Sequence, residues 1–355
     1  MFLSMMQNYA TIIVFFLCWF TYSCSALRLT PLLSTCIDAC QKGCHEIRKV
    51  QQKGGIISHE LKDENDPRSA LTEADRAAQQ VIVQSLRAEW GDQLNIIGEE
   101  EDDDDAANIS SSLDRTLLND DYGDEGGEND EMDIDISTIS IFVDPLDGTR
   151  EFVEGRLENV QCLIGIAIDG EAVAGAMGIP FPSNNDDEEG PTIVYGISGV
   201  GAGVLGTPLK RGPIPLVQHR DDPRPHYACG DSKVPVMKAC QKALIWEHGG
   251  STVLYGGAGN KALAAALGTV KCSFSYKIGG PWDLCAPQAI VQAMGGTMTD
   301  LFGQPIDIYR DPTCNVRGFL ATPPGEEMFH ERIAKAFLKE EEVQQYKKEI
   351  TVPSS

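Results

Sequence analysis

The sequence predicts a layered fold that combines helices and sheets, of α/β or α+β class. Segments with the spacing of amphipathic helices alternate along the chain with short apolar strands, and several of these strands are joined by tight turns. Hydrophobic residues make up 42% of the 355 residues, which is enough for a sizeable core. A chain of this length forms one large domain or two fused ones.

The first half begins with two predicted helices. Residues 29–53 carry apolar side chains three and four positions apart, and Gly54-Gly55 ends this helix. Thr72 is a suitable N-cap for a second helix from about 73 to 89.

Apolar strands follow these helices. A short strand at 94–97 stops before Gly98-Glu99-Glu100, and another covers 138–144. Residues 159–168 and 171–179 are predicted to pair through a tight turn at Asp169-Gly170.

Residues 192–205 are predicted to form a further hairpin. Within it, Gly201 to Gly206 matches the letters of the dinucleotide-binding fingerprint. Pro208 follows at once and no helix can open there, so this route to binding a nucleotide cofactor is rejected.

The C-terminal half alternates helices with strands. Helices are predicted at 236–248, in the alanine-rich segment after Gly256–Lys261, from Trp282-Asp283 to Met294, and at 325–339. Strands are predicted up to Tyr255, at 270–276 and at 316–321, with a hairpin turn at Leu301–Gln304. The chain thus divides into a targeting segment (1–27), an N-terminal α+β part (28–190), a C-terminal α/β part (191–340) and a polar tail (341–355).

The net charge of −24 is concentrated in one segment. Residues 101–135 hold fifteen Asp or Glu and one basic residue, Arg115. Such a block repels itself and cannot bury a core, so we expect a disordered acidic insertion; loose binding of Ca²⁺ is an alternative role for it. The chain has no basic patch with interleaved aromatic residues, which argues against a nucleic-acid polymer as partner.

Residues 1–27 are predicted to be a signal segment. Thr11 to Phe20 is a ten-residue apolar run, too short to cross a bilayer comfortably, and small residues at Ser23–Ala26 suit a signal peptidase. Cleavage would leave no stable membrane span; an uncleaved membrane anchor is the alternative. The secretory lumen (ER or Golgi) or secretion is expected, with a plastid reached by a signal-led route as the other possibility. The sequon Asn108-Ile-Ser110 fits secretory entry.

Eleven cysteines are present, nine of them beyond the signal segment. Cys36, Cys40 and Cys44 lie four apart on one helix face, which indicates a packing stripe of small residues. A metal site would need further ligands, and no second Cys/His cluster has zinc spacing. The odd count argues against a full disulfide framework.

The most informative motif is Ile141-Phe-Val-Asp-Pro-Leu-Asp-Gly-Thr149. A buried strand runs into a turn that Pro145 and Gly148 enforce, so that Asp144, Asp147 and the carbonyl of Leu146 can face one point. Hard cations such as Mg²⁺ prefer oxygen ligands of this kind. Thr149 adds a hydroxyl beside them.

Further carboxylates stand at the ends of predicted elements. Glu99 ends a strand, and Asp75 and Asp283 each start a helix. Taken singly, each has an ordinary structural explanation, such as the preference of carboxylates for helix starts. Together with the Asp144–Thr149 turn, a metal site explains them better.

These motifs resemble the inositol monophosphatase superfamily of Mg²⁺-dependent, lithium-sensitive phosphatases. The matching stretches are Gly98-Glu99-Glu100, Asp144-Pro-Leu-Asp-Gly-Thr149 and Trp282-Asp-Leu-Cys-Ala-Pro287. Within the superfamily the chain is most similar to the 3′(2′),5′-bisphosphate nucleotidase group, through Thr72-Glu-Ala-Asp-Arg76, Asp144 to Gly155, Asn159 to Ala167, Gly256 to Lys261 and Trp282 to Thr299. The resemblance implies a layered αβαβα sandwich of the kind shared with fructose-bisphosphatases.

The resemblance also implies roles for the carboxylates. Glu99, Asp144 and the Leu146 carbonyl match the ligands of a first Mg²⁺, and Asp144, Asp147 and Asp283 match those of a second, with two or three ions in all. Asp75 and Thr149 match the pair that, with Glu99, orients and deprotonates the attacking water.

Substrate contacts are implied as well. Gly148, Gly257, Ala258 and Gly259 match backbone that approaches the substrate closely, and Lys261 matches a lysine that offsets a second phosphate, although a solvated lysine is the alternative. In Cys229 to Val234 the family pattern is altered: Ser232 is kept, but Lys233 and Asp231 replace the usual histidine and arginine. Ser232 and Lys233 are still expected to contact substrate, Lys233 as a point charge for a phosphate.

The sequence thus predicts a Mg²⁺-dependent phosphomonoesterase with a small-molecule phosphate as substrate. The expected reaction removes the 3′-phosphate of adenosine 3′,5′-bisphosphate to give AMP, with 3′-phosphoadenylyl sulfate as a second substrate. The alternatives are an inositol polyphosphate 1-phosphatase or inositol monophosphatase on the same scaffold, or a catalytically inactive, acidic Ca²⁺-binding secretory protein.

Overall fold

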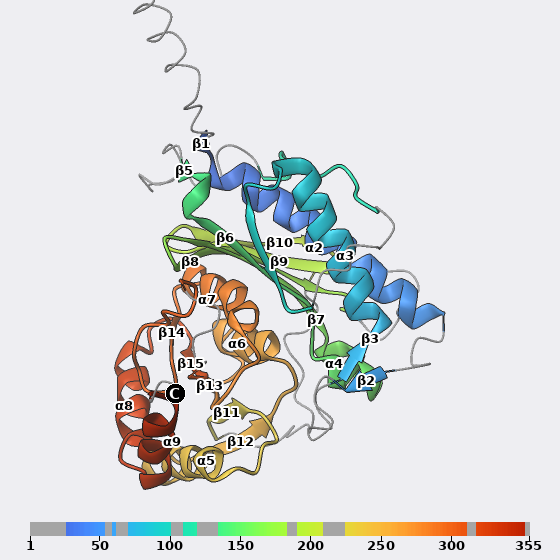
Figure 1. The fold of residues 1–355 in the computed structure, drawn as a ribbon. Coiled ribbons are helices and arrows are strands. Elements are labelled where there is room, and N and C mark those ends of the chain that lie inside the picture. The colour runs from blue at the N-terminus through green and yellow to red at the C-terminus, as the bar shows by residue number, and fades with distance from the viewer. Residues whose placement is uncertain are drawn as a thin grey trace, which may run out of the picture.

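A computed structural model describes residues 26–53, 59–61, 70–100, 109–118, 134–182, 190–208, 224–310 and 317–351 (Figure 1). The signal segment predicted at 1–27 lies outside these residues except for Ala26–Leu27, which form strand β1. No helix among the residues described is both long and apolar enough to cross a membrane.

Two helices form the first layer. Helix α2 covers Leu29–Gln52 and α3 covers Glu73–Trp90, so both predicted helices are confirmed to within a residue or so. Thr72 caps α3 as expected: its hydroxyl accepts a hydrogen bond from the Ala74 amide, and the Asp75 carboxylate accepts one from the Thr72 amide.

A six-stranded sheet forms the second layer, with strand order β10-β9-β8-β7-β6-β4. Its strands are β4 (Asn95–Gly98), β6 (Ile139–Asp147), β7 (Gln161–Ile168), β8 (Glu171–Ile179), β9 (Thr192–Ile197) and β10 (Gly201–Gly206). All neighbours are antiparallel except β4 and β6, which run parallel. The sheet therefore continues past the division predicted at residue 190.

Glycines let helices approach this sheet closely on both faces. A Cβ at Gly178 would overlap the sulfurs of Cys44 and Cys40 on α2. On the opposite face, Cβ atoms at Gly165 and Gly175 would overlap Cys285 and Ala286 on helix α7. The three cysteines of α2 are fully buried free thiols, as expected of a packing stripe.

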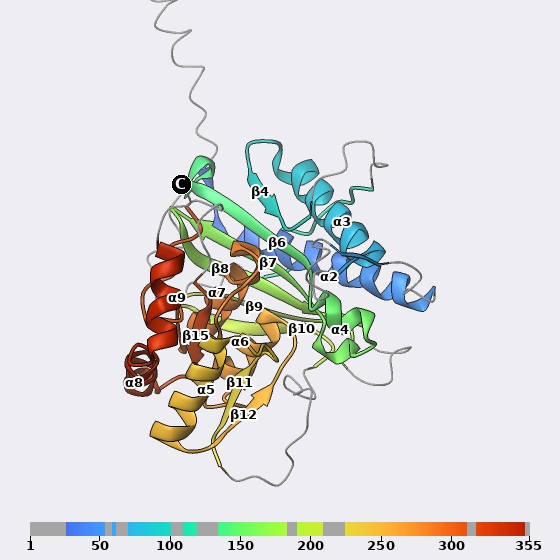
Figure 2. The same cartoon turned by 60° about the horizontal axis from the view of Figure 1, so that its bottom comes forward.

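The remaining layers come from the C-terminal half. Helices α6 (Ala258–Ala266) and α7 (Cys285–Ala293) separate the first sheet from a five-stranded sheet with order β12-β11-β13-β15-β14 (Figure 1). Its strands are β11 (His226–Cys229), β12 (Ser251–Leu254), β13 (Cys272–Ser275), β14 (Thr297–Thr299) and β15 (Phe319–Thr322). Helices α5 (Pro235–His248), α8 (Glu327–Phe337) and α9 (Glu341–Thr351) cover its outer face (Figures 1 and 2). The αβαβα sandwich is confirmed.

One expectation for the C-terminal half was wrong. The hairpin predicted around Leu301–Gln304 does not form, because β14 pairs instead with β15. The Asp300 carboxylate accepts hydrogen bonds from the Phe302 and Gln304 amides, and this fixes the turn without a following strand in the described residues. The polar tail contains α9, whose Val343 is fully buried.

Part of the acidic insertion, predicted to be disordered, is packed on the helices. In residues 109–118 the side chains of Leu113 and Leu118 are buried in the same core as α2 and α3. The Leu118 amide donates to the Ser34 hydroxyl at 3.2 Å. Ile134–Asp135 form strand β5, which pairs with β1. The packed stretch 109–118 holds one acidic residue, Asp114, and one basic residue, Arg115, so burial of its leucines is not opposed by the charge of the rest of the insertion.

Candidate active site

The Asp144–Thr149 turn lies at the end of β6. The pairing register between β6 and β7 is interrupted between Asp144 and Asp147, which turns the two carboxylates and the Leu146 carbonyl out of the sheet. The Leu146 amide donates to Asp144 Oδ1 at 3.0 Å, which closes the turn. Gly148 has φ +89°, and a Cβ there would lie 2.8 Å from the Asn159 carbonyl oxygen, so only glycine suits this position.

Neighbouring elements bring the other carboxylates to the same place. Glu99 follows β4, and its amide donates to the Val143 carbonyl at 3.0 Å, so it stands beside Asp144 at the end of the parallel strand pair. Asp283 ends the 3-10 helix Pro281–Asp283, and its Oδ2 accepts from the Gly279 amide at 2.7 Å. Asp147 accepts from the Ala258 and Gly259 amides at 2.8 and 2.7 Å, at the start of α6.

Glu99, Asp144, Asp147 and Asp283 line one cavity of about 400 Å³ between the two sheets. Burial, followed by the neighbouring charges of Glu99 and Asp147, raises the pKa of Asp144 well above its ordinary value and that of Asp283 to about 8. Carboxylates this close repel one another unless a cation compensates them, and their all-oxygen donor set fits a hard divalent ion. Among the described residues, no group of three His, Cys, Asp or Glu side chains is already arranged as a metal site.

Asp75 and Thr149 form a hydrogen-bonded pair at the cavity wall. Thr149 Oγ1 lies 3.0 Å from Asp75 Oδ1 and 3.1 Å from the Leu146 carbonyl oxygen, while Asp75 Oδ2 accepts from the Thr72 amide at 2.7 Å. Asp75 is fully buried, and burial raises its pKa to about 7, against the opposing effect of the Thr72 hydrogen bonds. Thr149 lines the cavity and Asp75 does not.

The predicted substrate residues are partly brought together. Gly148, Ser232, Gly257, Ala258 and Lys261 line the cavity, whereas Lys233 is exposed outside the lining and Gly259 only supports Asp147. The Lys261 ammonium is buried and donates to the carbonyl oxygens of Tyr255 and Gly257. Burial lowers the pKa of Lys261, although Asp147 nearby favours its charged form.

Sequence reasoning missed several cavity residues. Arg150 lies in the lining and makes ion pairs of 2.7 Å each with Glu154 and Asp231. Ser275 to Gly279 form another stretch of wall. Arg150 was detectable, because it directly follows the Asp144–Thr149 motif; the 275–279 segment has no motif and is placed only by the fold.

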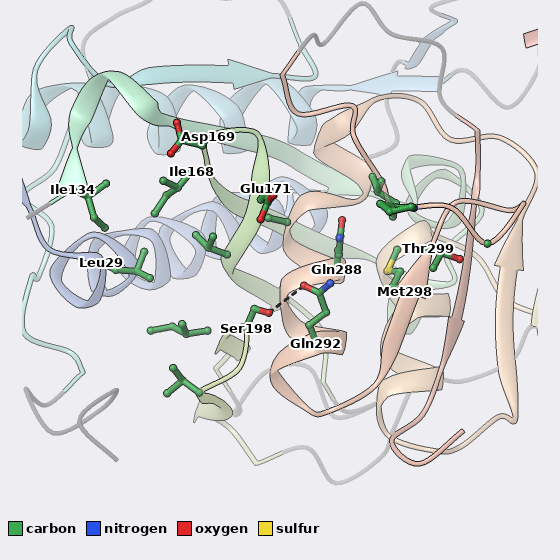
Figure 3. A pocket seen from close by; sticks show the side chains of 17 residues that line it. Leu29, Ile134, Ile168, Asp169, Glu171, Ser198, Gln288, Gln292, Met298 and Thr299 are labelled. Carbon is green, nitrogen blue, oxygen red and sulfur yellow. Dashed lines mark hydrogen bonds between the residues drawn. The ribbon is translucent and has the colours of Figure 1, made fainter. Parts of the chain in front are cut away.

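A second cavity, of about 970 Å³, lies elsewhere, between the β8 and β9 edge, α2 and α7 (Figure 3). Leu29, Ile134 and Ile168 line one side and Gln288 and Gln292 project from α7 on the other (Figure 3). Its only ionisable side chains among the described residues are Asp169 and Glu171, so it lacks the clustered carboxylates of the first cavity.

The sequence comparison supports the family that the site suggests. The family model described as "Inositol monophosphatase family" matches residues 28–342. The chain belongs to the inositol monophosphatase family and is a hydrolase of phosphoric monoesters.

The chain is also similar to individual proteins of known name. The chain is 31% identical to 3′(2′),5′-bisphosphate nucleotidase 1 of Homo sapiens, over 87% of this chain and 96% of the relative. It is 33% identical to the protein of the same name from Dictyostelium discoideum, over 81% of this chain and 90% of the relative. The structure of extragenic suppressor protein suhB from Bartonella henselae has the same fold, with a TM-score of 0.60 at 20% identity, over 87% of this chain and 98% of that one.

Proposed function

We propose that this protein is a Mg²⁺-dependent phosphatase that removes the 3′-phosphate of adenosine 3′,5′-bisphosphate and releases AMP. The observation that supports this most directly is the set of four carboxylates, Glu99, Asp144, Asp147 and Asp283, that lines one cavity. The names of the two nucleotidase relatives, which align over most of the chain, support the nucleotide as substrate.

The carboxylates are the proposed Mg²⁺ ligands. Glu99, Asp144 and the Leu146 carbonyl would hold one ion, and Asp144, Asp147 and Asp283 a second. Bound Mg²⁺ would neutralise charge on the phosphate and on the leaving oxygen, which is the main requirement of phosphate-ester hydrolysis. The amides of Ala258 and Gly259 keep Asp147 oriented, and the Gly279 amide does the same for Asp283.

Thr149, Asp75 and Glu99 are proposed to direct the attacking water. The Thr149 hydroxyl can accept a hydrogen bond from water while it donates to Asp75, 3.0 Å away. Thr72 fixes the other oxygen of Asp75, so the pair is oriented before substrate arrives. The water oxygen attacks phosphorus and its proton passes by way of Thr149 to the Asp75 carboxylate. The bond from phosphorus to the 3′-oxygen breaks, and that oxygen takes up a proton to become the 3′-hydroxyl of AMP.

The substrate side of the cavity is proposed to include Gly148, Ser232, Gly257, Ala258 and Lys261. Backbone without a Cβ at Gly148 and Gly257 allows a phosphate or ribose to approach closely. The same site would accept 3′-phosphoadenylyl sulfate, because the group that is cleaved is identical. Lithium inhibition is expected, since Li⁺ would compete for oxygen ligands.

An inositol phosphate is the second candidate substrate. Asp231 lines the cavity next to Arg150, 2.7 Å away, and a carboxylate in that position can accept hydrogen bonds from ring hydroxyls. This observation favours a polyol over a second phosphate near that part of the wall.

One experiment separates the two substrates. Phosphate release is measured from adenosine 3′,5′-bisphosphate and from inositol 1,4-bisphosphate, with Mg²⁺, with Mg²⁺ plus Li⁺, and after chelation. We expect the nucleotide to have the higher kcat/KM and activity to vanish on chelation. A higher kcat/KM for the inositol phosphate would refute the nucleotide assignment, and activity that survives chelation would refute the metal assignment.

We further propose that the chain enters the secretory pathway through residues 1–27. The apolar run and the small residues that follow it support this route. A chain that starts near Ala26 is expected to be soluble. Recovery of that truncated chain in the membrane fraction would contradict the proposal.

A further inference from the structure

One wall of the carboxylate cavity is a single stretch of chain, the 275–279 segment. Ser275, Tyr276, Lys277, Ile278 and Gly279 all line the cavity. The segment leaves the end of β13 and leads into the 3-10 helix that carries Asp283. Its last residue donates its amide to the Asp283 carboxylate at 2.7 Å. The position of this segment therefore affects both the cavity wall and a proposed metal ligand.

Helix α9 holds the segment in place. The Tyr346 hydroxyl donates to the Tyr276 carbonyl oxygen at 2.7 Å, and the two rings meet edge to face with centroids 5.8 Å apart. On the other side, Gly318 has φ +64°, and a Cβ there would overlap the carbonyls of Ser275 and Tyr276. The Tyr276 peptide is thus confined from two directions by residues distant in the sequence.

The three cationic side chains that line the cavity differ in the protein groups that neutralise their charge. Arg150 pairs with both Glu154 and Asp231 at 2.7 Å. The Lys261 ammonium is enclosed by carbonyl oxygens and lies beside Asp147. Lys277 is exposed in the lining and makes no ion pair with the part of the chain that the structure describes. Of these three side chains, Lys277 is the one whose charge is not close to a carboxylate of the described residues.

We propose that Lys277 binds the phosphate that is not cleaved, and that Tyr346 positions Lys277 through the 275–279 segment. This inference rests on the proposed function, because it assumes a substrate with two phosphates. Metal ions would compensate the phosphate at the carboxylates, whereas a second phosphate needs its own cation. A lysine serves as a point charge and tolerates some variation in the position of that phosphate.

The test compares two substrates that share the cleaved bond. Adenosine 3′,5′-bisphosphate carries the second phosphate and 3′-AMP does not. In K277M we expect kcat/KM for the bisphosphate to fall about tenfold, mainly through KM, because a hydrogen bond between charged groups is lost. Activity on 3′-AMP should stay unchanged, and K277R should recover most of the loss. The inhibition constant of 5′-AMP, which retains only the second phosphate, should rise by the same factor in K277M.

A matched control is K238M. Lys238 is an exposed lysine on α5 that does not line the cavity, so this substitution removes the same charge without the proposed contact. The kcat and KM of this variant for both substrates should equal those of the wild type. A general effect of net charge on substrate attraction would instead appear in both lysine variants.

Tyr346 is tested with Y346F, which removes only the hydroxyl. We expect the KM for the bisphosphate to rise a few-fold while kcat and the constants for 3′-AMP stay at wild-type values, because the lost hydrogen bond is to Tyr276 and the Gly279 amide still holds Asp283. V343A is the control for α9, because Val343 is fully buried on the same helix. This variant should lower the melting temperature and leave KM unchanged.

The outcomes distinguish failure of the proposed function from failure of the proposed role of Lys277. If the wild type hydrolyses neither nucleotide, the proposed function and this inference fail together. If the wild type is active and K277M changes both substrates equally, or neither of them, the role of Lys277 is refuted and the proposed function stands. If Y346F lowers kcat for both substrates alike, Tyr346 supports the fold and does not position Lys277.

Discussion

Acid is expected to destabilise this protein through His330, a buried residue of α8. The side chain is 3% exposed, with Nε2 2.8 Å from Thr299 Oγ1 and Nδ1 3.0 Å from Thr322 Oγ1. The Thr299 hydroxyl donates to the Asp300 carbonyl at 2.8 Å, so it accepts from Nε2–H of His330. Nδ1 is then the acceptor for the Thr322 hydroxyl. This arrangement satisfies both ring nitrogens of the neutral imidazole.

The magnitude follows from the change in pKa on folding. Burial lowers the pKa of His330 from 6.5 to about 4, and the charge of the adjacent Glu331 offsets this only in part. Because the folded pKa is depressed, the unfolded chain takes up the proton first, and stability is lost as the pH falls through 6.5 towards 4. Between pH 7 and pH 5 this residue alone should reduce the free energy of unfolding by about 2 kcal/mol.

The assay is urea unfolding of the wild type and H330Q at pH 7, 6 and 5. Glutamine keeps a donor for Thr299 but does not titrate, so H330Q should be about 1 kcal/mol less stable at pH 7. The difference between the two proteins should shrink and reverse towards pH 5. Effects of the other titrating groups cancel in this difference, because they are common to both proteins. Two stability curves that stay parallel from pH 7 to pH 5 would refute the reasoning.

Three further substitutions test the site and the core. Asp144→Asn should abolish phosphate release while the melting temperature is kept, because both proposed ions lose a ligand; full turnover would contradict the metal assignment. Leu118→Ala should reduce the free energy of unfolding in urea by about 2–3 kcal/mol, because the side chain is buried in the core; an unchanged midpoint would show that the 109–118 segment does not pack there. Gly178→Ala should cost about 1–3 kcal/mol, because the new Cβ overlaps the Cys44 sulfur, and adding Cys44→Ala should restore part of that loss; no recovery would point to backbone strain instead.

Predictions from sequence motifs were most accurate where a few neighbouring residues fix the local geometry. The Asp144–Thr149 turn depends on a proline, a glycine with positive φ and short hydrogen bonds within four residues, so its letters are enough to predict its form. Thr72 and Asp75 form a capping box that is also readable locally. The prediction of a hairpin at Leu301–Gln304 was wrong because the pairing of β14 is not local. Its partner strand, β15, lies well beyond that turn in the sequence.

The substrate side was the least predictable part. Lys233 was expected to contact substrate because it stands in a family stretch, yet it lies exposed outside the cavity lining. Lys277 was not predicted, because no motif marks the 275–279 segment. The prediction of disorder for the acidic insertion was also wrong in part. It was based on the overall charge, but Leu113 and Leu118 of the insertion are buried against α2 and α3.

By itself, the sequence determined the carboxylates proposed as metal ligands, the rigid turn that carries two of them, the hydroxyl beside that turn and the alternation that gives five layers. These features are encoded in the type and spacing of neighbouring residues. Only the tertiary structure decided which distant residues share the cavity. Lys277 lines the same cavity as the carboxylates, and the Tyr346 hydroxyl of α9 reaches the Tyr276 carbonyl beyond the end of β13. Contacts between residues far apart in the chain depend on how whole layers pack, and no short pattern in the sequence records them.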